Sequence, residues 1–73
     1  MDKAEWKKVL EAEVEKRFNP ADVDGFENSA PSIKLGILGE IYDEDEANGK
    51  IEQEKELAYG ELASEYETMG SWN

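Results

Sequence analysis

The segment from Glu40 to Glu67 most constrains what this chain can fold into, because dense negative charge and regularly spaced apolar residues share it. It holds eleven acidic residues against two lysines, and therefore carries −9 of the chain's formal net charge of −11. The larger apolar residues spread through it are Ile41, Tyr42, Ile51, Leu57, Tyr59, Leu62 and Tyr66. The spacing of these residues favours helices that bury one face over a disordered acidic tail.

The later part of this segment is predicted to belong to a helix over residues 51–69. The residues that share one face of this helix are Ile51, Ala58, Leu62, Tyr66 and Met69. Two like-charge pairs at four-residue spacing, Glu52–Glu56 and Glu61–Glu65, each destabilise an isolated helix by roughly 0.2–0.5 kcal/mol. Helix stability alone would favour lysines at such positions, so these carboxylates indicate an additional role.

A second helix is predicted at the start of the chain, over residues 2–18. Asp2 and Glu5 have the spacing of a capping box, with Asp2 in the place of the usual Ser or Thr. The apolar residues that form one stripe are Trp6, Val9, Leu10, Val14 and Phe18. Five acidic and five basic residues cancel over residues 1–17, so the negative charge of the chain is concentrated away from this helix.

The pair Asn19-Pro20 is predicted to end the first helix, because proline disfavours helical geometry in the residue before it. The same pair suits the cap and first residue of a short helical turn over residues 20–24, closed by Gly25. Phe26 is expected to anchor the following loop against the core. Trp72 is expected either to fold back onto the core or to lie exposed.

Residues 33–42 fit either a strand or a helix. The residues that alternate as in a strand are Ile33, Leu35 and Ile37. The residues that fit a helical stripe are Leu35, Leu38, Ile41 and Tyr42. The pattern therefore leaves two folds to compare.

Proline and glycine bear on this choice. Pro31 and Ser32 suit the amino end of a helix. Gly36 and Gly39 would each cost about 1 kcal/mol in a helix interior, although their three-residue spacing would let another backbone come close. The sequence favours a helix, and hence an all-α fold: a small compact bundle of about three helices in one acidic domain spanning residues 1–73. The alternative is an α+β fold with a strand near Ile33–Tyr42.

The composition argues against catalysis. The chain has no cysteine and no histidine, which are the residues that most often supply nucleophiles, general bases and metal ligands. Its many acid pairs would need a carboxyl group buried in a pocket to act as a general acid, and 73 residues leave little room for one. We predict no enzyme activity, no catalytic residue, no cofactor and no metal site.

The charge and hydropathy of the chain restrict its surroundings and partners. No apolar run approaches the roughly 18 residues of a membrane span, and the first residues do not resemble a signal peptide, so a cytoplasmic location is expected. Direct binding to nucleic acid is disfavoured because phosphate contacts need a basic surface. Anionic membranes are disfavoured for the same reason. Basic surfaces of other proteins are the natural partners.

Residues 44–55 are similar to an EF-hand calcium loop placed between two helices. With Gly49 at the sixth position, Glu52 falls at the ninth, as the motif requires. Glu44 and Glu46 depart from the motif because they stand where shorter Asp side chains are usual. The twelfth position, which should supply a bidentate Glu, is Lys55. An Asn-Gly helix-to-helix turn with solvated acids explains the same residues more simply. A degenerate cation-binding loop is therefore the third functional hypothesis, after the two that follow.

The acidic surface itself is the leading candidate for a binding site. Acids at three- and four-residue steps on a helix lie about 5–6 Å apart, which is comparable to the spacing of phosphates along one nucleic-acid strand. Held on helices, they could occupy the basic nucleic-acid channel of another protein. The predicted partner-binding residues are Glu40, Asp43, Glu44, Asp45, Glu46, Glu52, Glu54, Glu56, Glu61 and Glu65.

In size and charge the chain resembles the DNA-mimic and anti-defence inhibitors encoded by phages and mobile elements. The resemblance implies a non-enzymatic inhibitor or regulator that blocks the basic nucleic-acid-binding site of a defence, repair or transcription protein, as anti-CRISPR and anti-restriction proteins do. The alternative is a small accessory or assembly subunit of a larger complex. In that case the apolar stripe and Trp72 make the interface and the acids confer solubility.

Overall fold

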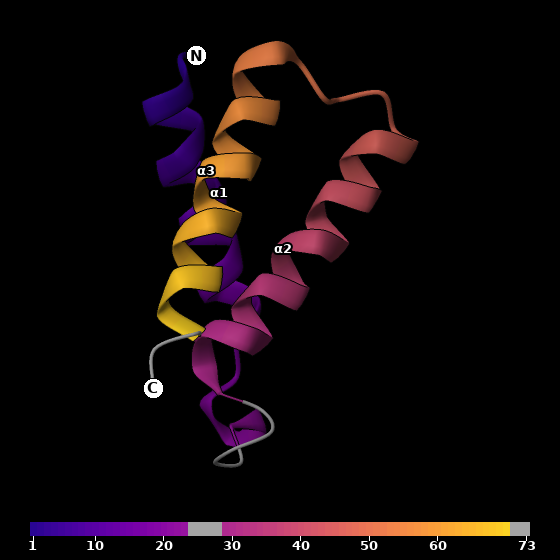
Figure 1. Ribbon diagram of the computed structural model, residues 1–73. Coiled ribbons are helices and arrows are strands. Elements are labelled where there is room, and N and C mark those ends of the chain that lie inside the picture. The colour runs from indigo at the N-terminus through magenta and orange to yellow at the C-terminus, as the bar shows by residue number, and fades with distance from the viewer. Residues whose placement is uncertain (24–28, 71–73) are drawn as a thin grey trace.

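Local capping signals divide the chain into helices. The computed structural model describes residues 1–23 and 29–70, which form α1 (Lys3–Arg17), a short 3₁₀ helix η1 (Pro20–Asp22), α2 (Ala30–Ala47) and α3 (Gln53–Gly70) (Figure 1). These ranges contain no strand, which confirms the all-α prediction. None of the described helices is long and apolar enough to cross a membrane. Gly25, Phe26 and Trp72, for which the sequence also carried expectations, lie outside the described residues.

The predicted caps of the first two elements are present. The Asp2 carboxylate accepts a hydrogen bond from the backbone N–H of Glu5 at 2.9 Å and so satisfies one of the free donors at the start of α1. The Asn19 side chain accepts a hydrogen bond from the N–H of Ala21 at 3.0 Å and caps η1, whose first residue is Pro20. Both caps depend on residues close in sequence, and for that reason the sequence located them.

Helix α2 is longer than the sequence indicated. Ser29 caps it, with its hydroxyl accepting from the N–H of Ser32 at 3.4 Å, and the helix continues to Ala47. The strand alternative for residues 33–42 is therefore wrong. Its strand-like alternation is overridden because a helix buries Leu38 and Ile41 together on the side that faces the core.

An Asn-Gly turn connects α2 to α3. Gly49 adopts a φ of 67°, which glycine reaches without steric cost. The Asn48 side chain donates to the carbonyl of Glu44 at 2.8 Å, and the N–H of Lys50 donates to the carbonyl of Asp45 at 2.8 Å. The turn reverses the chain, so that α3 runs antiparallel to α2 and parallel to α1 (Figure 1).

Helix α3 supplies half of the core. The buried apolar residues are Leu10, Val14, Leu38, Ile41, Ala58, Tyr59, Leu62 and Tyr66. The last four belong to α3, which packs against both other helices. Two apolar residues expected near the core are instead largely exposed, Val9 at 46 % and Leu57 at 51 %. The buried stripe of α1 is consequently narrower than its sequence suggested.

Candidate functional site

The structure separates the ten predicted partner-binding carboxylates into two groups. Six of them contact donors of this chain, namely Glu44, Asp45, Glu52, Glu54, Glu61 and Glu65. The other four make no hydrogen bond or ion pair within the described part of the chain, namely Glu40, Asp43, Glu46 and Glu56. Nothing in the sequence distinguished the two groups.

Lysines of α1 neutralise one acidic row of α3. Lys3 Nζ lies 2.9 Å from a carboxylate oxygen of Glu61, and Lys7 contacts both Glu61, at 3.6 Å, and Glu65. The hydrogen bond from Lys3 lowers the pKa of Glu61. The like charges of Glu61 and Glu65 are therefore bridged by a cation on the neighbouring helix. The interpretation that folding disfavours this pair is wrong, because α1 supplies the counter-charge.

Removing this bridge is expected to have a small effect that depends on salt. Lys7→Gln should lower the melting temperature at low ionic strength, because Glu61 and Glu65 would then repel each other without a shared cation. The loss should shrink in 1 M NaCl, where the Debye length is about 3 Å. Lys8→Gln is the matched control, since Lys8 is exposed and makes no ion pair in the described part of the chain. Equal losses for the two variants at low salt would contradict the bridge.

A bidentate ion pair joins α1 to α2. Arg17 donates from Nη1 to Oε2 of Glu44 at 2.8 Å and from Nη2 to Oε1 at 3.0 Å, and its Nε contacts Glu13 at 3.2 Å. The hydrogen bonds from Arg17 lower the pKa of Glu44. Lys34 of α2 adds a second link, 2.5 Å from Glu15. These pairs link α1 to α2, and they pair the charge of Glu44 although its side chain stays exposed.

A buried polar cluster lies where the three helices meet near the Asn-Gly turn. Lys55 is only 7 % exposed, and its Nζ lies 2.5 Å from Oδ2 of Asp45. The Tyr59 hydroxyl donates to the same oxygen at 2.5 Å. The ammonium of Lys55 also lies 4.6 Å from the centre of the Trp6 ring, within the range of a cation–π interaction. The indole N–H of Trp6 donates to Glu52 at 2.6 Å.

The charges within this cluster compensate one another. Burial by itself would raise the pKa of Asp45, but the hydrogen bonds from Lys55 and Tyr59 outweigh it and leave the pKa lowered. Burial, together with the bond to Asp45, raises the pKa of the Tyr59 hydroxyl. The cluster therefore holds a carboxylate and an ammonium in a satisfied pair, which is a structural arrangement rather than a reactive one.

The same cluster explains the lysine that departs from the calcium-loop pattern. Lys55 places its ammonium against Asp45, which falls at the second position of the motif and is not one of its ligand positions. Residues up to Ala47 belong to α2 instead of a loop. Glu44, which would be the first ligand, binds Arg17 instead. Residues 1–23 and 29–70 contain no group of three or more side chains arranged to hold a metal ion.

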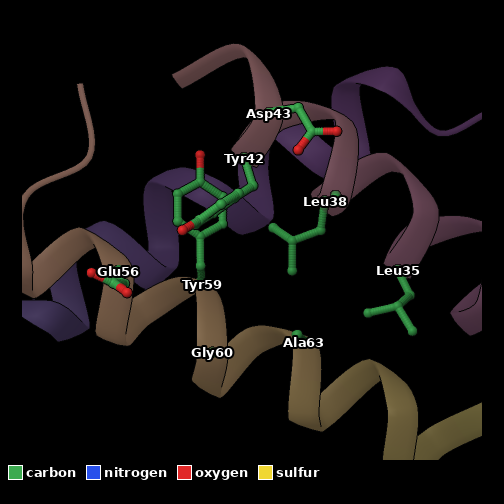
Figure 2. Close-up of a pocket in the computed structure, with 9 residues that line it drawn as sticks. Leu35, Leu38, Tyr42, Asp43, Glu56, Tyr59, Gly60 and Ala63 are labelled. Carbon is green, nitrogen blue, oxygen red and sulfur yellow. The ribbon is translucent and has the colours of Figure 1, made fainter. Parts of the chain in front are cut away.

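An apolar groove runs between α2 and α3 (Figure 2). It has a volume of about 480 Å³. Its lining residues are Leu35, Leu38, Gly39, Tyr42, Asp43, Glu56, Tyr59, Gly60 and Ala63. Leu35 and Leu38 point from α2 toward α3 (Figure 2). The Tyr42 and Tyr59 rings meet edge to face, with their centroids 5.0 Å apart, and close one end of the groove.

Unpaired carboxylates surround the Tyr42 end of this groove. Asp43 and Glu56 line it, and Glu46 follows one helical turn after Tyr42. Partial burial raises the pKa of the Tyr42 hydroxyl, and the negative charges of Glu56, Glu46 and Asp43 raise it further. We call these three carboxylates the acidic rim. All three belong to the predicted partner-binding residues. The sequence did not predict that they would border an apolar groove.

Most of the groove could not be predicted from the sequence because no local pattern marks it. Its lining residues come from two helices that the chain brings together only after the turn. Glycines in the middle of both helices were the available signal, since glycine is unfavourable there. Gly39 was interpreted as permitting a close approach, whereas Gly60 drew no interpretation.

Comparisons with protein-family models, with curated proteins and with solved structures find no match for this chain. The fold defines it as a small acidic three-helix protein. The features of the molecule that bear on its function are the groove, the acidic rim and the distribution of paired and unpaired charges.

Proposed function

We propose that this protein is a non-enzymatic acidic inhibitor or regulator, which binds the basic surface of a nucleic-acid-handling protein through its α2–α3 face. The observation that carries the proposal is the distribution of charge pairs. Acids that face α1 form ion pairs within the chain, whereas the rim carboxylates Asp43, Glu46 and Glu56 make no ion pair in the described part of the chain. These unpaired carboxylates are free to meet cations of a partner.

The spacing of the rim carboxylates suits a partner surface whose basic residues are arranged to bind phosphates. Asp43 and Glu46 are three residues apart on α2, a step that separates side chains on a helix by about 5–6 Å. Glu56 extends the negative charge across the groove to α3. Lysines and arginines arranged for a phosphate backbone would meet carboxylates at comparable intervals. Association driven by such charges is fast and weakens as salt rises.

Neutralising the rim tests this proposal. The variant Asp43→Asn/Glu46→Gln/Glu56→Gln should lose most of the nucleic-acid-binding proteins that the parent chain captures from a host-cell lysate, because it lacks the attracting charges. Duplex DNA added as a competitor should displace the same proteins from the parent chain. The readout is the identity and amount of captured protein at increasing salt concentrations.

The matched control removes three other carboxylates that carry no ion pair in the described ranges. Glu5→Gln/Glu11→Gln/Glu67→Gln changes the net charge by the same amount but leaves the rim intact, and it should retain capture. Equal losses for the two triple variants, or capture that DNA leaves unchanged, would refute the proposal.

The apolar lining of the groove favours a second candidate function. A small accessory or assembly subunit would bury Leu35, Tyr42 and Ala63 against a larger complex, with the acids serving solubility. Its binding would persist in high salt and would tolerate the neutralised rim. Truncating Tyr42 to alanine would then abolish capture, whereas the rim variant would not.

A further inference from the structure

We infer that the α2–α3 groove receives an amphipathic helix of the partner, one whose apolar stripe is flanked by Lys or Arg side chains. The inference rests on the proposed function and specifies the kind of segment that this function would recognise. Three features of the groove support it: its two central glycines, its apolar floor and its acidic rim.

The glycines provide the first argument, because the chain's own packing does not require them. A Cβ atom built at Gly39 or at Gly60 meets nothing within 4 Å. Each glycine nevertheless costs a helix interior about 1 kcal/mol relative to alanine. Both line the groove, one on each of its helices. Their absent side chains leave the lining of the groove open, and small residues let a helix backbone approach closely.

The floor of the groove provides the second argument. Its volume of about 480 Å³ falls within the range of roughly 300–1,000 Å³ that is typical of ligand pockets. Leu35 and Ala63 lie on its walls and remain only half-buried. A groove between two antiparallel helices is the usual receptor for a third helix, which inserts apolar side chains at three- and four-residue steps.

Charge complementarity identifies the occupant as basic. Asp43 and Glu56 stand on opposite sides of the groove, and Glu46 extends the rim along α2. None of the three pairs with a cation in the described part of the chain. A helix that carried acids beside its apolar stripe would be repelled, whereas Lys or Arg side chains there would reach the rim.

The test uses a synthetic 18-residue peptide whose leucines follow the three- and four-residue steps of one helical face and whose other residues are mostly lysine. Calorimetry with the full chain should give saturable binding. The variant Gly39→Leu/Gly60→Leu should weaken that binding about tenfold or more, because its new side chains fill the space the peptide needs. This variant should stay folded, since leucine is the better helix former and a Cβ atom at either position meets nothing within 4 Å.

Two controls separate groove binding from charge attraction. An isocharged peptide with glutamine in place of leucine should bind about tenfold more weakly than the leucine peptide. Ala4→Leu/Ala12→Leu adds a similar apolar surface to exposed positions of α1 and should leave the affinity unchanged. Backbone amide shifts on peptide addition should concentrate at residues that line the groove.

The outcomes distinguish the inference from the proposed function. If the groove-filled variant binds the leucine peptide as well as the parent does, while the neutralised rim abolishes binding, the inference is refuted and the proposed function stands. If the variant with the neutralised rim binds the leucine peptide with the parent's affinity and salt dependence, the rim does not attract a basic segment. The proposed function itself then fails. Self-association of the chain that the groove-filled variant abolishes would show a second copy as the occupant and would also overturn the inference.

Discussion

Asp45→Asn should lower the free energy of unfolding by about 3 kcal/mol at pH 7, because it leaves the buried ammonium of Lys55 without its counter-charge. The Tyr59 hydroxyl would lose a charged acceptor as well. For a domain of this size that loss is a large fraction of the total stability. Urea denaturation followed by circular dichroism measures it.

Two variants calibrate this result. Glu46→Gln removes an exposed, unpaired carboxylate next to Asp45 and should change stability by less than about 0.5 kcal/mol. The double variant Asp45→Leu/Lys55→Met removes both charges and should recover most of the loss, because apolar residues can replace a buried pair. A cost for Asp45→Asn no greater than that of Glu46→Gln would show that the pair is not a buried one.

The effect of Asp45→Asn should depend on pH in one direction. The pKa of Asp45 is lower in the folded chain than its ordinary value of 3.8, so its pairing stabilises the fold fully above that value. As the pH falls through the folded pKa, Asp45 takes up a proton and comes to resemble asparagine. The stability difference between the parent and Asp45→Asn should therefore shrink below about pH 3.8 and stay constant between pH 5 and 7.

Gly39→Ala/Gly60→Ala should raise the free energy of unfolding by about 2 kcal/mol, roughly 1 kcal/mol for each glycine replaced inside a helix. The added methyl groups meet nothing within 4 Å, so no steric cost offsets the gain. For a domain of this length, each kcal/mol corresponds to roughly 4–8 °C in melting temperature. Thermal unfolding of the single and double variants measures the shift.

Gly49→Ala is the control with the opposite sign. Gly49 also has open space around it, but its φ of 67° is strained for any residue with a Cβ. That variant should therefore be less stable than the parent. A destabilising effect of Gly39→Ala or Gly60→Ala would mean that these glycines serve the fold itself, and the argument that they leave room for a partner would lose its basis.

Short-range signals account for what the sequence predicted correctly. The cap formed by Asp2 and Glu5, the stop at Asn19-Pro20 and the turn at Asn48-Gly49 each involve residues only a few positions apart. Their energies depend on the local backbone and not on the rest of the fold. The start of α2 was less well predicted, because no feature of the sequence favours Ser29 over Ser32 as the N-cap of this helix.

The sequence by itself determined that the chain would form acidic helices and that the acids would gather in its second half, since composition and periodicity suffice for both. Only the tertiary structure decided which acids remain available to a partner. Glu61 and Glu56 look alike in sequence, yet one faces the lysines of α1 and the other borders the α2–α3 groove. The difference arises because ion pairs depend on distances between helices, and packing of the apolar faces sets those distances.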